Sequence, residues 1–174
     1  YRVMAARILA AAREAELEPS IWYTPADAAA EMRHWLGAGL VLRPQASGDL
    51  GARLAASVHV VDPGQGWLAV GADCPRLDAR LLREAAALIA SGHVVLGPTL
   101  DGGYDLVGGV SPLPDIFSEM PWSTDRLLGA TRSRLTAPAL EGTASSASRK
   151  ATEKAPTSSY SLCRISMCSG MVVV

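Results

Sequence analysis

The feature that most constrains the fold of this chain is a regular alternation of short apolar runs with longer stretches of helical periodicity. Residues 67–70 form a continuous apolar run, which is typical of a strand covered on both faces. In residues 78–91, apolar side chains recur along one face of a helix. Because parallel strands are joined by helical crossovers, this alternation predicts an α/β fold with a mainly parallel open sheet and flanking helices.

The remaining elements follow from the same periodicities and from capping residues. Thr24 and Pro25 resemble a cap and a first helical residue, and Asp49, Asp78 and Thr124 are further candidate caps. We expect the strand near Leu42 to be buried, like the others. The expected strands are residues 20–23, 40–42, 67–70, 93–96 and 104–107, and the expected helices are residues 3–15, 25–35, 49–58, 78–91 and 124–135.

The chain divides by composition into a globular part and a tail. Its 174 residues, of which 49% are hydrophobic, are enough for one domain with a substantial core. After about Thr136, alanine, serine, threonine, lysine and proline dominate without periodicity. We therefore predict one domain over residues 1–135 and a disordered, low-complexity tail over residues 136–174.

Charge and cysteine content exclude several classes of partner. The formal net charge of −1 provides no basic footprint for nucleic acid or an anionic membrane. No apolar run approaches the roughly 18 residues of a membrane-spanning helix, and no secretory signal is recognisable. Three cysteines without zinc-type spacing indicate neither a disulfide framework nor a metal cluster. A reducing, cytoplasmic location is expected, and the oligomeric state stays open.

Asp73 directly follows the apolar run that predicts the central strand, and Pro75 then prevents the strand from continuing. In an open α/β sheet, ligands bind in the crevice at the carboxyl ends of the strands, so this carboxylate is expected there. Mg²⁺ or Mn²⁺, held by one or two carboxylates together with substrate phosphates, would explain an acid at this place. The alternative is an ordinary loop acid that caps nearby amides.

A second acid, Asp101, opens the sequence Asp101-Gly102-Gly103-Tyr104 between two expected strands. The two glycines allow positive φ angles, and the tyrosine offers a ring that stacks on a base or sugar. The same four residues are also a plain hairpin turn. We expect a hairpin whose functional role depends on its proximity to Asp73.

Two further segments carry candidate binding residues. Gly48-Asp49-Leu50-Gly51-Ala52-Arg53 opens an expected helix, where backbone amides bind an anion or where Asp49 is simply the N-cap. Pro121-Trp122-Ser123-Thr124 presents an indole and two hydroxyls to a sugar, or else anchors the loop before the last helix.

Taken in order, these four segments resemble one family. It comprises small bacterial glycosyltransferase-A-like proteins, often described as arsenosugar-biosynthesis or selenodomain-associated glycosyltransferases, and the resemblance covers residues 1–135. It implies a nucleotide-diphospho-sugar transferase fold and transfer of a glycosyl group from a nucleotide sugar to a small-molecule acceptor. A divalent cation, Mg²⁺ or Mn²⁺, would assist the departure of the nucleotide.

The resemblance also assigns roles to residues of this chain. Asp73 stands where the family's metal-binding catalytic acid lies, and Asp101 is a second acid near the metal or acceptor. The nucleotide side would be lined by Gly48, Asp49, Gly51 and Arg53, and the substrate side by Gly102, Gly103, Tyr104, Trp122, Ser123 and Thr124.

Departures from the family pattern leave two alternatives open. The family begins with a strand and a lysine-bearing phosphate loop that this sequence lacks before Tyr1, so we expect a truncated fold. One alternative is therefore a catalytically silent fragment with a binding role. Asp73 is followed by Cys74-Pro75 rather than by a second acid. A nucleotidyltransferase that acts on a phosphorylated small molecule is therefore the other alternative.

Overall fold

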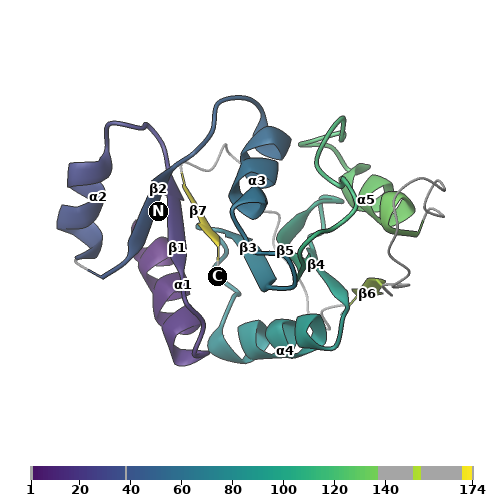
Figure 1. Cartoon of the computed structure of the whole chain (residues 1–174), viewed down its shortest axis with the longest axis horizontal. Helices are drawn as coiled ribbons and strands as arrows, with labels where there is room; N and C mark the ends of the chain where they lie inside the picture. The colour runs from purple at the N-terminus through teal and green to yellow at the C-terminus, as the bar shows by residue number, and fades with distance from the viewer. Residues whose placement is uncertain (1, 38, 137–150, 154–169, 174) are drawn as a thin grey trace.

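The computed structural model describes residues 2–37, 39–136, 151–153 and 170–173. These residues form a sheet flanked by helices on both faces (Figure 1). The helices are α1 (Arg2–Glu14), α2 (Ala29–Leu36), α3 (Leu50–His59), α4 (Ala79–Ala90) and α5 (Leu127–Thr136). The strands are β1 (Ser20–Tyr23), β2 (Val41–Pro44), β3 (Gly66–Gly71), β4 (Val94–Pro98), β5 (Tyr104–Val110), β6 (Ala151–Glu153) and β7 (Gly170–Val173).

The sheet has the strand order β2-β1-β7-β3-β5-β4-β6. Following the pairings across it, β1, β2, β3, β4 and β6 point in one direction, whereas β5 and β7 run against them. The predicted α/β fold with flanking helices is thereby confirmed. Its consequence for function is that the carboxyl ends of β1, β2, β3 and β4 share one edge of the sheet.

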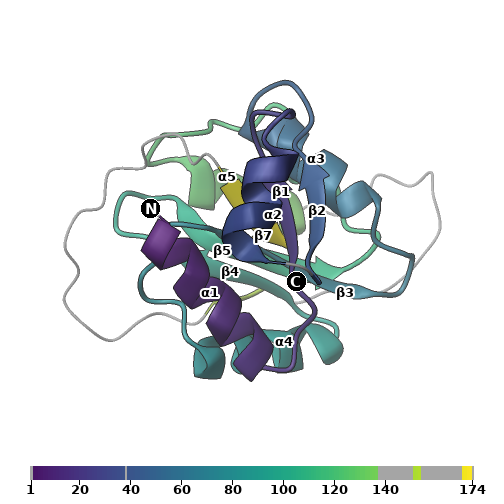
Figure 2. The ribbon, with the colours of Figure 1, turned by 90° about the vertical axis from the view of Figure 1, so that its left-hand side faces the viewer.

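The central strand β3 is buried on both faces, as its continuous apolar run predicts. Leu68 and Val70 belong to a core cluster with residues of α1 and α4, whereas Trp67 and Ala69 belong to a second cluster with residues of α3 and the loop before α5. Figures 1 and 2 show α1 and α4 along one face of the sheet and α3 and α5 along the other. The two clusters hold the strand in place, so the turn that follows it is firmly positioned.

The predicted start of α2 and the predicted burial of the strand near Leu42 are wrong. Helix α2 begins at Ala29 rather than near Pro25, and its N-cap Ala28 makes no side-chain capping bond, so Thr24 is not the cap. The strand near Leu42 is β2, whose residues are mostly exposed, with Val41 52% exposed. It lies at the edge of the sheet, where one side has no neighbouring strand within the described residues, and an edge strand is not covered on all sides.

Thr124 is not the cap of α5 either, because that helix begins three residues later, at Leu127. The starts of α3 and α4 agree with the capping residues in the sequence. Asp49 caps α3 by accepting a hydrogen bond from the Ala52 amide at 2.8 Å, and Asp78 caps α4 by accepting one from the Leu81 amide at 2.8 Å. Of the predicted tail after residue 135, the structure describes Thr136 and strands β6 and β7. The remaining tail residues lie outside the described ranges. None of the described helices has the length and apolar character needed to cross a membrane.

Candidate functional site

Three predicted motifs lie in turns at the shared carboxyl edge of the sheet. The turn after β2 contains Gly48, the turn after β3 contains Asp73, and the turn after β4 contains Asp101. Each preceding strand points toward this edge, as established by the pairing directions. The fold therefore gathers residues that are far apart in the sequence at the place where open α/β sheets bind ligands.

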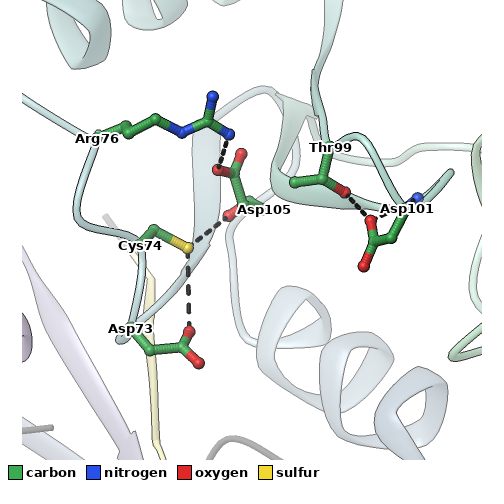
Figure 3. A network of polar contacts seen from close by, with 7 residues as sticks. Asp73, Cys74, Arg76, Thr99, Asp101 and Asp105 are labelled. Atoms are coloured by element: carbon green, nitrogen blue, oxygen red, sulfur yellow. Dashed lines mark hydrogen bonds and ion pairs between the residues drawn. The ribbon is translucent and has the colours of Figure 1, made fainter. Parts of the chain in front are cut away.

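Asp73 is connected to strand β5 through Cys74 (Figure 3). The sulfur of the buried Cys74 lies 4.0 Å from Oδ1 of Asp73 and 3.8 Å from the backbone oxygen of Asp105. The Asp73 side chain remains partly exposed at the turn. Cys74 thus packs beneath the turn as a small buried residue, while the carboxylate of Asp73 stays accessible to a ligand.

Asp105 is a second carboxylate near Asp73, and its pKa is the most strongly shifted among the acids of the site. Its pKa is raised from 3.8 to about 6, mainly by burial, which disfavours the charged form. The guanidinium of Arg76, 3.9 Å from Oδ2 of Asp105, opposes this rise, whereas the negative charges of Asp73 and Asp101 add to it. Perturbed acids of this kind cluster at functional sites, although ion-pair networks also produce them.

Asp101 is engaged mainly within its own turn (Figure 3). Its Oδ1 accepts hydrogen bonds from the Thr99 hydroxyl at 2.5 Å and from the Gly103 amide at 3.3 Å. The turn joins the antiparallel strands β4 and β5, so the expected hairpin is confirmed. Gly102 adopts a φ of 80°, which is the conformation for which glycine is suited.

The Asp101 turn is docked on the loop that precedes α5. A Cβ atom at Gly102 would lie 2.1 Å from the backbone oxygen of Asp125, and the Leu128 amide donates to the Gly102 oxygen at 2.9 Å. Tyr104 packs edge-on against Trp122 with ring centroids 6.3 Å apart. Gly102 and Tyr104 of one predicted motif therefore pack against Trp122 of the other and the loop that follows it.

Trp122 also contacts the start of α3. A Cβ atom at Gly51 would lie 2.5 Å from Nε1 of Trp122 and 2.3 Å from the backbone oxygen of Phe117. The Trp122 Nε1–H is buried and has no hydrogen-bond partner within the described residues. These contacts favour the anchoring alternative for Trp122, because its polar edge faces the protein rather than a ligand.

The remaining predicted residues divide between structural contacts and exposure. Arg53 donates from Nε to the Gly48 oxygen at 3.1 Å and from a terminal nitrogen to Oε1 of Gln45 at 3.4 Å, which holds the turn before α3. The Thr124 hydroxyl donates to the Pro121 oxygen at 2.7 Å. Ser123 is exposed with a φ of 61°. Of these two residues, Ser123 is the more exposed, whereas Thr124 uses its hydroxyl within the loop.

Asp105 and Arg76 were not singled out from the sequence, although a signal existed. Asp105 is a charged residue inside a strand that is otherwise composed of apolar residues and glycine after its first position. A buried charge is costly unless it is paired, so such a position indicates a partner or a function. Arg76 lies two residues beyond Cys74, in the loop that follows β3.

The donor set fits a divalent cation only together with a ligand. No group of three or more histidine, cysteine, aspartate or glutamate side chains able to hold a metal occurs within the part of the chain that the structure describes. Asp73 is a partly exposed carboxylate at the strand edge, and Mg²⁺ is commonly held by one or two carboxylates plus substrate phosphates. The residues present are compatible with a cation held by Asp73 together with substrate phosphates.

The fold is shared with a solved structure. The chain superposes with a TM-score of 0.64 and 24% identity on a crystal structure from Desulfovibrio desulfuricans G20, provisionally described as a nucleotide-diphospho-sugar transferase. The match covers 76% of this chain and 62% of that chain, so this chain spans less than two thirds of its structural neighbour. A comparison with curated proteins gave no match.

A family profile identifies the chain more directly. It matches residues 7–124, which include most of α1, all of α2 to α4, strands β1 to β5 and all four motifs. The fourth motif, Pro121-Trp122-Ser123-Thr124, ends at the last matched residue. The match covers more than half of the sequence, and the chain therefore belongs to the family described as "Uncharacterized protein conserved in bacteria (DUF2064)".

Proposed function

We propose that this chain derives its function from nucleotide-diphospho-sugar transfer, in which a glycosyl group passes from a nucleotide sugar to a small-molecule acceptor. The observation that carries the proposal is the convergence of Asp73 and the turns containing Gly48 and Asp101 at one sheet edge, in a fold shared with a protein provisionally described as such a transferase. The finer assignment to arsenosugar or selenium-related chemistry stays a prediction.

Asp73 is the proposed ligand of a divalent cation, Mg²⁺ or Mn²⁺, at the diphosphate of the donor. The chemistry supplied by such a cation is neutralisation of the charge that develops on the leaving nucleotide. Asp73 suits this role because its carboxylate is partly exposed directly after a buried strand. The buried Cys74 supports this position, because its sulfur contacts both Asp73 and Asp105 of β5.

The nucleotide side is proposed to be the start of α3, with Gly48, Asp49, Gly51 and Arg53. The amino end of this helix is at the same sheet edge, where its backbone dipoles favour a negatively charged group. Asp49 already uses one carboxylate oxygen as the N-cap, so its contribution to binding is the shape of the turn. Arg53 stabilises that turn through Gly48 and Gln45.

The acceptor side is proposed to be the surface formed by the Asp101 turn and the loop before α5. Gly102 and Gly103 shape the Asp101 turn, with Gly102 packed against the backbone of Asp125, and Tyr104 packed against Trp122 forms a rigid wall. Ser123 offers an exposed hydroxyl. Asp101 is the second proposed catalytic acid, acting through the carboxylate oxygen that its own turn does not use.

Calorimetric titration of a panel of nucleotide sugars with Mn²⁺ tests the proposal. For Asp73→Asn we expect at least about a tenfold loss of affinity, since a hydrogen-bonded or ionic contact to a charged group contributes roughly 1.5–3 kcal/mol. The melting temperature should change little, because Asp73 is partly exposed and not a packing residue. The matched control is Asp62→Asn, because Asp62 is an exposed acid that precedes β3, at the amino ends of the strands.

The outcomes separate the alternatives. No heat with any nucleotide sugar, in protein shown to be folded by circular dichroism, would refute donor binding and favour a silent fragment with a binding role. Release of pyrophosphate from a nucleoside triphosphate and a phosphorylated acceptor would favour nucleotidyl transfer, because glycosyl transfer releases none. A lowered melting temperature with unchanged affinity in Asp73→Asn would show that Asp73 is a structural loop acid.

A further inference from the structure

An exposed arginine, Arg76, lies in the loop that carries Asp73. It follows Asp73 by three residues, and the Leu77 amide donates to the Cys74 oxygen at 3.3 Å within this loop. A terminal nitrogen of Arg76 lies 3.9 Å from Oδ2 of Asp105, which is near the start of the neighbouring strand β5. The fold therefore holds a positive charge at the sheet edge where the acids of the candidate site gather.

The ion pair between Arg76 and Asp105 is unequal in exposure. The Asp105 side chain is 19% exposed, whereas that of Arg76 is 43% exposed. A largely buried carboxylate is costly without a nearby counter-charge, so Asp105 favours conformations in which the guanidinium stays at this place. A guanidinium carries five N–H donors, so the exposed part of this side chain can contact a ligand while the pairing with Asp105 is kept.

An arginine held in this way is suited to a phosphate group. The planar guanidinium matches the oxygens of a phosphate, which it binds through two parallel hydrogen bonds. Binding normally costs the rotamer freedom of a long side chain, and an ion pair has already reduced that freedom. Arg76 is thus preorganised for an anion.

The charges around Arg76 define which anion fits. The negative charges of Asp73 and Asp101 act on Asp105, so the site is rich in carboxylates and repels a bare anion. An anion that arrives with a divalent cation offsets this repulsion. In the view of Figure 3, the Asp73 carboxylate and the Arg76 guanidinium lie on either side of Cys74, so a ligand that engages both must carry negative charge at two places. A diphosphate with its cation meets both requirements.

We infer that Arg76, positioned by Asp105, binds the diphosphate of the nucleotide donor beside the divalent cation proposed at Asp73. This contact rests on the proposed function, which supplies both the diphosphate and the cation. The guanidinium shares with the cation the neutralisation of negative charge on the leaving nucleotide. Asp105 does not touch the ligand and acts only through Arg76, as a positioning residue.

Calorimetric titration of the full-length chain with inorganic pyrophosphate in the presence of Mn²⁺ tests this contact without knowledge of the donor base. Arg76→Gln should bind pyrophosphate at least about tenfold more weakly, because a hydrogen bond between charged groups is lost. Arg76→Lys keeps the charge without the planar fork, so its affinity should lie between those of wild type and Arg76→Gln. The matched control is Arg83→Gln, which should bind as wild type does. Arg83 is also an ion-paired arginine, 50% exposed and 3.5 Å from Oε1 of Glu14.

The role of Asp105 is tested by combining substitutions. The loss of affinity caused by Arg76→Gln should be at least about threefold smaller in the Asp105→Asn background, because an arginine that is not held contributes less to binding. An equal or larger loss in that background would show that Asp105 does not position Arg76. A role of Asp105 in stability alone would leave the loss unchanged, so the comparison distinguishes positioning from folding.

A second measurement uses the unsubstituted chain and does not depend on the folding of any variant. Phenylglyoxal modifies accessible arginine side chains, and mass spectrometry of the resulting peptides locates the modified residues. Saturating pyrophosphate with Mn²⁺ should protect Arg76 from modification, while Arg83 continues to react. Equal modification of Arg76 with and without pyrophosphate would overturn the contact.

These results are distinguishable from those that test the proposed function. If nucleotide sugars bind and Asp73→Asn weakens their binding, but Arg76→Gln binds pyrophosphate as wild type does, the Arg76 contact is overturned and the proposed function stands. If pyrophosphate binds through Arg76 but no nucleotide sugar binds, the diphosphate contact stands and the glycosyl donor is wrong. Absence of pyrophosphate binding to the folded wild-type chain, or an equal loss of affinity in Arg76→Gln and Arg83→Gln, overturns the contact.

Discussion

At the scale of single residues, Gly51 explains how two distant motifs become one surface. It is the second residue of α3, and the indole of Trp122 and the backbone of Phe117 occupy the space that a side chain would need. The glycine is therefore required for close packing and not for an unusual backbone angle. Trp122 in turn contacts Tyr104, so the nucleotide and acceptor sides of the proposed site meet at this glycine.

Substitution of Gly51 by alanine should destabilise the fold. A Cβ 2.3 Å from the Phe117 oxygen and 2.5 Å from Trp122 Nε1 forces the loop before α5 to move, at a cost of about 1–3 kcal/mol for an overpacked position. The matched control is Gly129→Ala in α5, where nothing lies within 4 Å and alanine should stabilise by about 0.5–1 kcal/mol. Urea unfolding measures both; equal effects would contradict the packing argument.

Asp105 is the residue whose protonation should affect stability. Its folded-state pKa is about 6, above the ordinary 3.8, so the folded protein holds this proton more tightly than the unfolded chain does. The resulting stabilisation is complete below about pH 4 and is lost as the pH rises through about 6. Asp105→Asn, which stays neutral, should gain about 2 kcal/mol relative to wild type between pH 4 and 7.

Chemical unfolding at several pH values in the presence of EDTA checks this prediction without interference from metal binding. Arg76→Gln provides the companion variant, because loss of the guanidinium that opposes the pKa rise should make the decline of stability with pH larger. A difference between wild type and Asp105→Asn that stays constant from pH 4 to 7 would show that Asp105 is not perturbed as its burial implies.

At the scale of elements, α3 poses the question whether Asp49 is a cap or a ligand. Asp49→Ala should cost about 1 kcal/mol of stability through loss of the N-cap, as should the equivalent Asp78→Ala in α4. Asp49→Asn preserves the capping ability and removes only the charge. If Asp49 acts through the shape of the turn, Asp49→Asn should bind nucleotide sugars as wild type does, and weakened binding measured by calorimetry would indicate a direct contact.

The elements differ in how far their sequences predict them. Strands β1 and β3 and helices α3 and α4 were predicted because local signals agree, with apolar runs for the strands and aspartate caps for the helices. The burial of β2 was predicted wrongly, because Leu40, Val41 and Leu42 do not show that their strand lies at a sheet edge. Edge position follows from the order of strands, which is set by non-local packing.

The candidate site shows the same division. Asp73 was found because it follows an apolar strand, and Asp101 because it opens a glycine-rich turn between two expected strands. Asp105 was missed because its importance depends on Arg76 and Cys74, which contact it from the loop after the neighbouring strand β3. The anchoring role of Trp122 likewise depends on Gly51, which is remote in sequence.

At the scale of the whole molecule, the sheet consists of two parts joined through β7. β2 and β1 lie on one side of β7, and β3, β5, β4 and β6 lie on the other. The first part is less well covered, since α2 has no fully buried residue and β2 is largely exposed. We therefore expect β2 and α2 to open more readily than β3 and β5.

Hydrogen–deuterium exchange followed by mass spectrometry checks this prediction. Amides of β2 and α2 should exchange faster than those of β3 and β5, and Val172→Pro should accelerate exchange in β1 more than in β4, which does not contact β7. Uniform protection of β2 and β3 would contradict a sheet of unequal stability.

The sequence by itself determined the α/β class, the central strand β3 and the candidate acids in the turns after β3 and β4. These features could be predicted because periodicity, capping and chain breaks are local properties of neighbouring residues. Only the tertiary structure decided which strands lie at the edge, that Asp105 faces Cys74 and Arg76, and that Trp122 rests on Gly51. It also decided that β7 fills the position between β1 and β3. These features depend on which remote segments pack together, and that choice is made by the burial and backbone pairing of the whole chain rather than by any one segment.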